Sequence, residues 1–201
     1  MLQKLERRWL PVIMKPLARL INRLGISPNT LTILGFLLTI GVGYVLSLGY
    51  IRIGGVLVLF SAIFDALDGT LARMSGRTTR FGAYLDSTLD RFSEAAIYLG
   101  LLIHFMGQNA TTEIVLIYLT IVGSLMVSYT RSRAESIGVS ITQGLLTRTE
   151  RIVVLVFVLC FNLVTFGLWV LAILCNVTAL QRMWLVWQRI GREDTQESRE
   201  A

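Results

Sequence analysis

The sequence predicts an all-α, polytopic membrane protein with six transmembrane helices, preceded by a short helix at the membrane surface. Composition gives the first observation: of 201 residues, 54% are hydrophobic and 16% are charged. A soluble domain has about 25% charged residues. The second observation is that the apolar residues form long blocks without the alternation of β-barrel strands. The third is that the basic residues fall almost entirely on one side of those blocks.

The apolar blocks give the expected transmembrane helices in chain order. The first four cover approximately residues 31–48, 54–72, 83–105 and 114–130. A further apolar stretch, residues 152–187, contains a single charge, Arg182. As one helix it would be about 54 Å long, whereas the hydrocarbon core of a bilayer is about 30 Å thick. We therefore expect this stretch to fold back around Asn162–Gly167 and to form the fifth and sixth helices.

The placement of charge predicts the orientation of the chain. Six spans leave both termini on one side of the membrane. If that side is the cytoplasm, all 19 lysine and arginine residues except Arg52 lie inside. This is the asymmetry that the positive-inside rule describes. We therefore expect a multi-pass protein of the cell membrane with both termini in the cytoplasm. The net charge of +6 then requires no nucleic-acid partner.

The chain divides into three expected segments. Residues 1–25 are predicted to contain a cytoplasmic juxtamembrane amphipathic helix, residues 26–190 the six-helix domain, and residues 191–201 a disordered cytoplasmic tail. The first segment is charged throughout, so it is not a signal peptide. Its helix has an apolar face of Leu17, Leu20, Ile21 and Leu24 and a basic face of Lys15, Arg19 and Arg23. A solvated basic tail is the alternative interpretation.

The cysteine and histidine content excludes two classes of protein. The two cysteines, Cys160 and Cys175, both lie in apolar runs and are expected to pack as small hydrophobic residues. A secreted disulfide scaffold is therefore excluded. The single histidine, His104, cannot support a histidine-rich zinc site.

Four aspartates lie where the second helix ends and the third begins. Asp65 and Asp68 are three residues apart, and Asp86 and Asp90 are four apart, so each pair shares a helical face. A charge within a spanning helix costs about 2.5–3.5 kcal/mol, so we expect a cation to balance these carboxylates. Hard oxygen ligands favour Mg²⁺ or Mn²⁺, as in two-metal sites. Two alternatives remain: the aspartates pair with arginines and only hold the bundle together, or they bind a transported cation.

The residues around these aspartates form a longer motif. The chain reads DALDGTLAR from Asp65 to Arg73, then eight residues, Gly82, three residues, Asp86, three residues and Asp90. This resembles the signature of the CDP-alcohol phosphotransferases, D-x2-D-G-x2-A-R-x8-G-x3-D-x3-D, at every fixed position. The resemblance implies a membrane transferase of phospholipid biosynthesis. Such enzymes move a phosphatidyl or similar group from a CDP carrier to a hydroxyl and release CMP. It also implies a homodimer.

The resemblance further implies a role for each residue of the motif. Asp65, Asp68 and Asp86 are expected to bind metal, with two Mg²⁺ ions, or Mn²⁺, as the cofactor. Asp90 is expected to act as the general base and to touch the second ion. The residues expected to line the CDP-lipid site are Pro28, Asn29, Thr30, Leu31, Gly69, Ala72, Arg73, Thr79 and Gly82. Pro28 and Asn29 have the alternative role of only starting a helix.

Two further stretches bear on the acceptor alcohol. Residues 128–136, SYTRSRAES, are similar to the S-Y-x-[KR]-A-R-A-E-S stretch of phosphatidylinositol-phosphate synthases, with Ser132 in place of alanine. Residues 148–151, RTER, are similar to an R-A-E-R segment of that subgroup. The resemblance implies that CDP-diacylglycerol is the donor and inositol 1-phosphate the acceptor. The acceptor phosphate would then bind Arg131, Arg148, Arg151 and Arg182.

Three alternatives to this assignment stay open. Glycerol 3-phosphate also has a phosphate, so a basic pocket is compatible with a phosphatidylglycerophosphate synthase. Those enzymes typically have an LDPLADK-like run, where this chain has LDSTLDR at residues 85–91. The arginines have the alternative role of setting topology or contacting lipid headgroups. A non-enzymatic cation carrier is the rival from another class, and metal-dependent release of CMP would exclude it.

Overall fold

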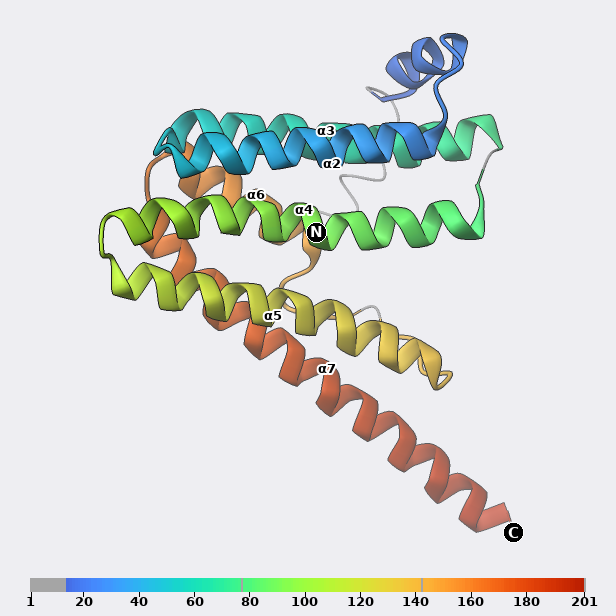
Figure 1. Ribbon diagram of the computed structural model, residues 1–201. Helices are drawn as coiled ribbons and strands as arrows, with labels where there is room; N and C mark the ends of the chain where they lie inside the picture. Colours follow the sequence, from blue (N-terminus) through green and yellow to red (C-terminus); the bar gives the residue numbers. More distant parts are fainter. Residues whose placement is uncertain (1–13, 77, 142, 201) are drawn as a thin grey trace.

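The computed structural model describes residues 14–76, 78–141 and 143–200. A short helix over residues 14–23 comes first. Figure 1 shows the six helices that follow it: α2 (Pro28–Ser47), α3 (Ile51–Ser75), α4 (Arg80–Gly107), α5 (Thr111–Ser136), α6 (Arg148–Cys160) and α7 (Val164–Glu200). The described ranges contain no strand, so the predicted all-α class is confirmed.

The ends of the helices follow from local sequence signals. α2 begins with Pro28, and the Ser27 hydroxyl accepts a hydrogen bond from the Thr30 N–H at 3.1 Å. α4 begins in the same way, because the Thr79 hydroxyl accepts from the Gly82 N–H at 2.9 Å. Between them, α3 ends at Gly76, whose φ of 65° lies in the left-handed region that glycine tolerates. These ends all lie at the same end of the bundle, on the right of Figure 1.

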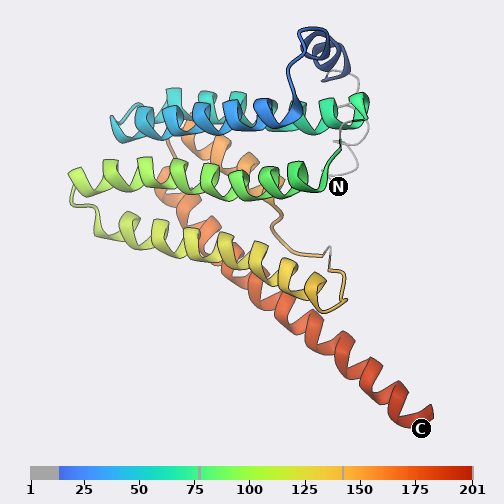
Figure 2. The same ribbon diagram turned by 45° about the vertical axis from the view of Figure 1, so that its right-hand side comes forward.

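The long apolar stretch folds back as predicted. The turn occupies residues 161–163, at the start of the predicted window, and Asn162 adopts a left-handed φ of 56°. α6 is therefore short, with 13 residues. α7 continues to Glu200 and projects past the other helices (Figures 1 and 2). The predicted disorder of residues 191–201 stays a prediction.

The six helices pack as a bundle in which neighbours along the chain are not always neighbours in space. α2 packs against both α3 and α4, and α5 packs against α4 and along α7 (Figures 1 and 2). α6 packs against α3 and α7. The backbones of α2 and α4 approach most closely at Gly43 and Gly100, where an added Cβ on either residue would overlap the opposing backbone. Small residues at such crossings are typical of helices packed within a membrane.

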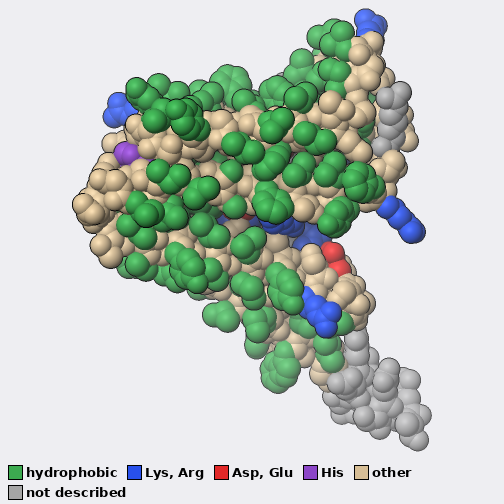
Figure 3. All heavy atoms as spheres, in the orientation of Figure 1, with side chains coloured by type: hydrophobic (Ala, Val, Ile, Leu, Met, Phe, Trp, Pro, Cys, Tyr) green, Lys and Arg blue, Asp and Glu red, His purple; other side chains and the backbone are tan. Residues whose placement is uncertain are grey.

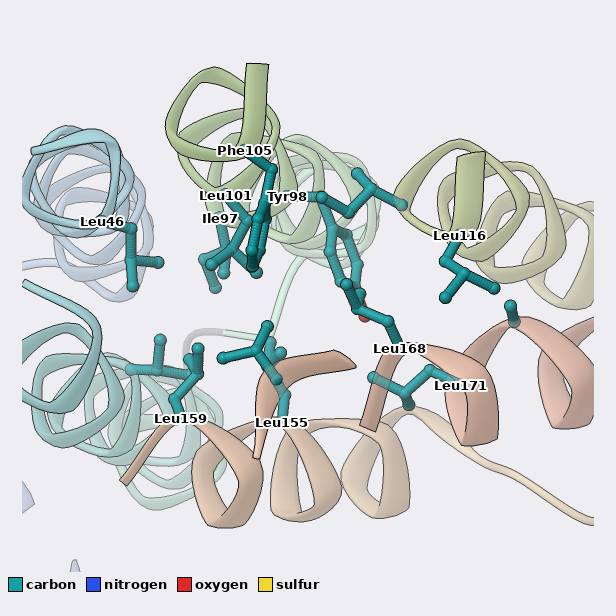
Figure 4. Packing of buried hydrophobic residues seen from close by; sticks show 14 of the residues in the cluster. Leu46, Ile97, Tyr98, Leu101, Phe105, Leu116, Leu155, Leu159, Leu168 and Leu171 are labelled. Atoms are coloured by element: carbon teal, nitrogen blue, oxygen red, sulfur yellow. The ribbon is translucent and has the colours of Figure 1, made fainter. Parts of the chain in front are cut away.

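The main hydrophobic core lies towards the end of the bundle opposite the aspartates. Figure 4 shows leucines of α2, α5, α6 and α7 packed around Ile97, Tyr98 and Leu101 of α4. Cys175 is fully buried in this core, in agreement with the prediction that it packs as a hydrophobic residue. The core holds the far ends of α4 and α6 together, so the near ends can present polar residues to one another.

Within the part of the chain that the structure describes, four helices are long and apolar enough to cross a membrane. They are α2, α3, α5 and the Val164–Gly191 part of α7. α4 bears charged residues over its first half and α6 is short, so a spanning role for these two stays a prediction. Hydrophobic side chains cover most of the face seen in Figure 3, far more than a soluble protein exposes. The chain is therefore a membrane protein.

The helix over residues 14–23 lies across the end of the bundle that holds the aspartates. Met14, Ala18 and Ile21 pack against Leu31 of α2 and Leu67 of α3. Leu17 and Leu20 of the helix are exposed, as is Leu24 in the turn that follows it. Residues 1–13 of the predicted first segment lie outside the described residues.

Candidate active site

The four predicted aspartates come together from two helices. Asp65 and Asp68 lie on the last turns of α3, and Asp86 and Asp90 on the first turns of α4. A cavity of about 1060 Å³ lies between α3 and α6, with Asp65, Asp68 and Asp86 at its polar end. Its other walls are mostly apolar side chains of the same two helices, such as Leu59 and Val156. One end of the cavity is thus suited to a charged group and the rest to hydrocarbon.

A second cavity, of about 170 Å³, adjoins the first where α2, α3 and α4 meet. Seven of the nine residues predicted for the CDP-lipid site line it: Pro28, Asn29, Gly69, Ala72, Arg73, Thr79 and Gly82. The remaining two do not: Thr30 takes part in the cap of α2, and Leu31 is buried against Leu67 and Leu71. Asp68 and Asp86 line both cavities, so the two spaces share a polar wall.

The two motif glycines of this second cavity differ in what surrounds them. A Cβ added at Gly82 would lie 2.9 Å from Asn29 Oδ1 and 3.0 Å from Thr79 Oγ1, so these two side chains would have to shift to admit it. A Cβ added at Gly69 would meet only the Arg73 guanidinium, at 3.6 Å. Packing within the protein therefore does not explain Gly69, and its open side faces both cavities.

Arg148, the first residue of α6, lies between carboxylates of α3 and α4. Its Nη2 atom is 2.6 Å from Asp65 Oδ2 and 2.7 Å from Asp90 Oδ1. Arg91 is more distant, with 3.9 Å between its Nη1 and Asp90 Oδ2. A guanidinium at this position offsets the repulsion among the four carboxylates, which the low dielectric of the bundle would otherwise make costly.

Asp68 differs from the other three aspartates. Its side chain is 4% exposed, and its Oδ2 atom has no hydrogen-bond partner among the described residues. A buried carboxylate oxygen without a donor is unfavourable unless a cation binds there. With the side chains as placed, no three acidic, histidine or cysteine residues of the described chain surround a common point. The carboxylate oxygens of the four aspartates are nevertheless the type of donor that suits a divalent cation.

The four arginines predicted for the acceptor phosphate occupy three different settings. Arg148 and Arg151 are neighbours on α6, and Arg151 is buried with Nε and Nη2 bound to the Glu94 carboxylate at 2.8 and 3.0 Å. Arg131 is exposed on α5, where it pairs with Glu135 at 2.9 Å. Arg182 is buried on α7 and donates hydrogen bonds to backbone carbonyls.

α7 anchors the loop between α5 and α6 through one face of polar side chains. The Leu146 N–H donates to Thr178 Oγ1 and the Leu145 N–H to Gln181 Oε1, both at 3.2 Å. Arg182 donates to the Gln143 carbonyl at 3.1 Å and to the carbonyl of Val127 on α5. The loop leads directly into α6, so these bonds also determine where Arg148 begins that helix.

A family model agrees with this geometry. The model described as CDP-alcohol phosphatidyltransferase matches residues 25–187, which include the five helices from α2 to α6 and most of α7. The chain belongs to the CDP-alcohol phosphatidyltransferase family. It is therefore a transferase, and the aspartate motif found in the sequence lies at the centre of the matched region.

Individual members of the family are similar over almost their whole length. The archaetidylinositol phosphate synthase of Pyrococcus horikoshii is 39% identical over 184 residues, which cover 90% of this chain and 95% of that protein. The crystal structure of Mycobacterium tuberculosis phosphatidylinositol phosphate synthase with CDP-DAG bound superimposes with a TM-score of 0.81. It is 32% identical, over 87% of this chain and 94% of that one. The same enzyme in complex with manganese and citrate gives a TM-score of 0.80 at 33% identity, over 87% and 88% of the two chains.

Sequence reasoning missed two contacts in this CDP-alcohol phosphatidyltransferase. The first is Arg148 between Asp65 and Asp90, and the second is the pairing of Arg151 with Glu94. A signal for the second was present, because Glu94 continues the four-residue spacing of Asp86 and Asp90. Acidic side chains one helical turn apart on α4 therefore lie opposite arginines one turn apart on α6.

Proposed function

We propose that the protein transfers the phosphatidyl group of CDP-diacylglycerol to a hydroxyl of inositol 1-phosphate and releases CMP. The observation that carries this proposal is the shared polar wall of the two cavities. There, carboxylates of α3 and α4 converge at the end of a space otherwise lined by hydrocarbon, and an arginine of α6 lines the larger of the two cavities beside them. A substrate with two acyl chains, a pyrophosphate and a nucleotide has matching chemistry. The relatives named for phosphatidylinositol and archaetidylinositol phosphate synthesis support the choice of acceptor.

The donor is expected to divide between the two cavities. Its acyl chains would occupy the apolar space between α3 and α6, and its nucleotide the smaller cavity beside Gly69 and Gly82. The open side of Gly69 would let the nucleotide approach the backbone of α3. The Arg73 guanidinium lines both cavities, so it can bind a phosphate at their junction. CDP-DAG bound to the related mycobacterial enzyme supports this choice of substrate.

Asp65, Asp68, Asp86 and Asp90 would hold the divalent cations, for which we propose two Mg²⁺ ions or Mn²⁺. The buried, partnerless Oδ2 of Asp68 supports a cation at this wall, and manganese in the related enzyme supports a divalent one. When bound, such ions neutralise the pyrophosphate and the charge that develops on the leaving group. Arg148 would then be free to exchange its carboxylate partners for the acceptor's phosphate.

Asp90 is the proposed general base. Its carboxylate would take the proton of the attacking inositol hydroxyl while the oxygen forms a bond to the phosphorus of the phosphatidyl group. The bond from that phosphorus to the bridging oxygen breaks, and CMP leaves with the electron pair. Arg148 lies 2.7 Å from Asp90. A phosphate bound to this arginine would therefore place the acceptor beside its base.

Arg131, Arg151 and Arg182 complete the predicted acceptor set, and their roles stay predictions. The described contacts favour Arg148 as the principal phosphate ligand, because it is the member of the set that lies against Asp90. Arg151 is already paired with Glu94, and Arg182 is bonded to backbone carbonyls. The rival acceptor is glycerol 3-phosphate, which would bind through the same phosphate contacts.

We further propose the arrangement of the protein in the cell membrane. All six helices from α2 to α7 would span the bilayer, with the aspartate end and both termini in the cytoplasm. The helix over residues 14–23 would lie in the membrane surface, and the exposure of Leu17, Leu20 and Leu24 supports this position. A homodimer is proposed from the family resemblance.

An acceptor panel tests the proposed reaction. Detergent-purified protein would receive CDP-diacylglycerol with inositol 1-phosphate, glycerol 3-phosphate, serine or free inositol, and CMP release would be measured with Mg²⁺ or with EDTA. We expect metal-dependent CMP release with inositol 1-phosphate. Release with glycerol 3-phosphate alone would assign the chain to the rival synthase. No release with any acceptor would support the cation carrier.

A further inference from the structure

Glu94 is the acidic residue of the site that neither the motif nor the proposed reaction uses. It lies on α4 one turn beyond Asp90, on the same face. Its two carboxylate oxygens accept hydrogen bonds from Nε and Nη2 of Arg151, at 2.8 and 3.0 Å. The Arg151 side chain is 2% exposed and that of Glu94 12%. Two parallel, buried bonds of this kind fix the mutual orientation of both groups.

This pair connects α4 to α6 in register with the site. On α6, Arg151 lies one turn beyond Arg148, and on α4, Glu94 lies one turn beyond Asp90. The contacts Arg148–Asp90 and Arg151–Glu94 are therefore two successive rungs between the same two helices. α6 packs chiefly on α3 and α7, and it shares with α4 the hydrophobic core away from the aspartates. The polar connection between α4 and α6 thus depends on these rungs.

The space beside the second rung is small and has both polar and apolar walls. A cavity of about 20 Å³ is lined by both arginines, Asp90, Glu94 and the hydroxyl-bearing residues Thr39, Ser61, Ser93 and Tyr98. It is large enough for about one water molecule. The Tyr98 hydroxyl is buried and has no partner among the described residues. Apolar side chains such as Ile152 and Leu155 also line this space, and among them the carboxylate of Glu94 orients the Arg151 guanidinium through two hydrogen bonds.

We propose that Glu94 is a positioning residue for the acceptor. Through Arg151 it sets the position of the first turn of α6 against α4, and so holds Arg148 where the acceptor's phosphate binds beside Asp90. This inference rests on the proposed function. In this arrangement Arg148 of the first rung contacts the substrate, and the Arg151–Glu94 pair of the second rung holds Arg148 in position for that contact.

The test begins with Glu94→Gln, which keeps the size of the side chain and removes its charge. We expect the KM for inositol 1-phosphate to rise about tenfold, while the KM for CDP-diacylglycerol changes less than about twofold. Glu113→Gln is the matched control, because Glu113 accepts a hydrogen bond from Thr165 at the opposite end of the bundle. It should leave both KM values unchanged. If Glu94→Gln raises both KM values equally, or neither, the positioning role is refuted.

The combination with Arg148→Ala separates positioning from general support of the fold. If Glu94 acts through Arg148, adding Glu94→Gln to Arg148→Ala should raise the acceptor KM by less than about twofold more. A full further tenfold rise would show that Glu94 acts independently of Arg148 and would overturn the proposal. Should Glu94→Gln fail to fold, Arg151→Lys retains the charge, removes the two-pronged geometry and should give the same change in acceptor KM alone.

The single variant Arg148→Ala distinguishes failure of this inference from failure of the proposed function. An unchanged acceptor KM in Arg148→Ala would remove Arg148 from the acceptor site, and both proposals would fall. A raised acceptor KM in Arg148→Ala, with no change in Glu94→Gln, would refute the positioning role alone.

Discussion

Replacing Arg151 with methionine should destabilise the protein far more than the same change at an exposed arginine. Methionine keeps the length and the apolar stem of the side chain but leaves the Glu94 carboxylate buried without a partner. Loss of one partner from a buried pair costs about 3–5 kcal/mol. Both side chains of the pair are largely buried from solvent, with Arg151 2% and Glu94 12% exposed. For a chain of this length the cost corresponds to a fall in Tm of about 6–20 °C.

The control is Arg131→Met, since Arg131 pairs with Glu135 while both side chains remain about half exposed, at 51% and 47%. An exposed pair contributes at most about 1 kcal/mol, so Tm should change by no more than about 4 °C. The double variant Glu94→Leu, Arg151→Met should regain most of the lost stability. Apolar residues of similar volume commonly replace a buried pair at little cost.

Cys175 supplies the assay. Its side chain is fully buried, so a thiol-reactive dye would label it only as the protein unfolds on heating in detergent. Cys160 is partly exposed and would first be replaced by serine in every variant. Equal Tm shifts for Arg151→Met and Arg131→Met would refute the reasoning. A double variant no more stable than Arg151→Met would do the same.

Three further predictions concern individual site residues. Asp90→Asn should lower turnover by at least about a hundredfold while CDP-diacylglycerol still binds with Mg²⁺, because the amide cannot take a proton; turnover near that of the unmodified enzyme would exclude Asp90 as the base. Asp68→Asn should weaken Mn²⁺ and nucleotide binding together, and unchanged Mn²⁺ affinity by electron paramagnetic resonance would remove Asp68 from the ligands. Arg182→Met should speed proteolytic cleavage of the α5–α6 loop and raise the acceptor KM with it, because this loop sets the position of Arg148; a raised KM with unaltered cleavage would instead support the sequence-based role of Arg182.

The helices and the aspartate positions could be predicted because both depend on short-range patterns. Apolar blocks mark α2 to α5 to within a few residues, and the spacing of Asp65, Asp68, Asp86 and Asp90 places them on facing turns. Most residues of the predicted CDP-lipid site also line one cavity, since the motif spans a single helix–turn–helix unit. Periodicity and turn signals are sufficient at this range.

The partners of the arginines could not be predicted in the same way. Arg148, Arg151 and Arg182 are basic residues near one side of the membrane, and the sequence offers each of them several acidic or carbonyl partners. The choice depends on the rotation of α6 and α7 about their axes and on the reach of a long, flexible side chain. Arg182 shows the difficulty, because a lone charge in an apolar run suggested a ligand site, whereas its described partners are backbone carbonyls of the same chain.

The anchoring of the α5–α6 loop to α7 has a consequence for engineering this protein. Loops that join helices are usually the places where an added epitope or a fluorescent domain does least harm. Here the N–H groups of Leu145 and Leu146 are already bonded to α7. An insertion would move the start of α6 relative to α7 and disturb the active site at a distance. The turn at residues 108–110, at the far end of the bundle, joins two long helices without such bonds to a third among the described contacts. That turn is the better place to insert a reporter that must leave catalysis intact.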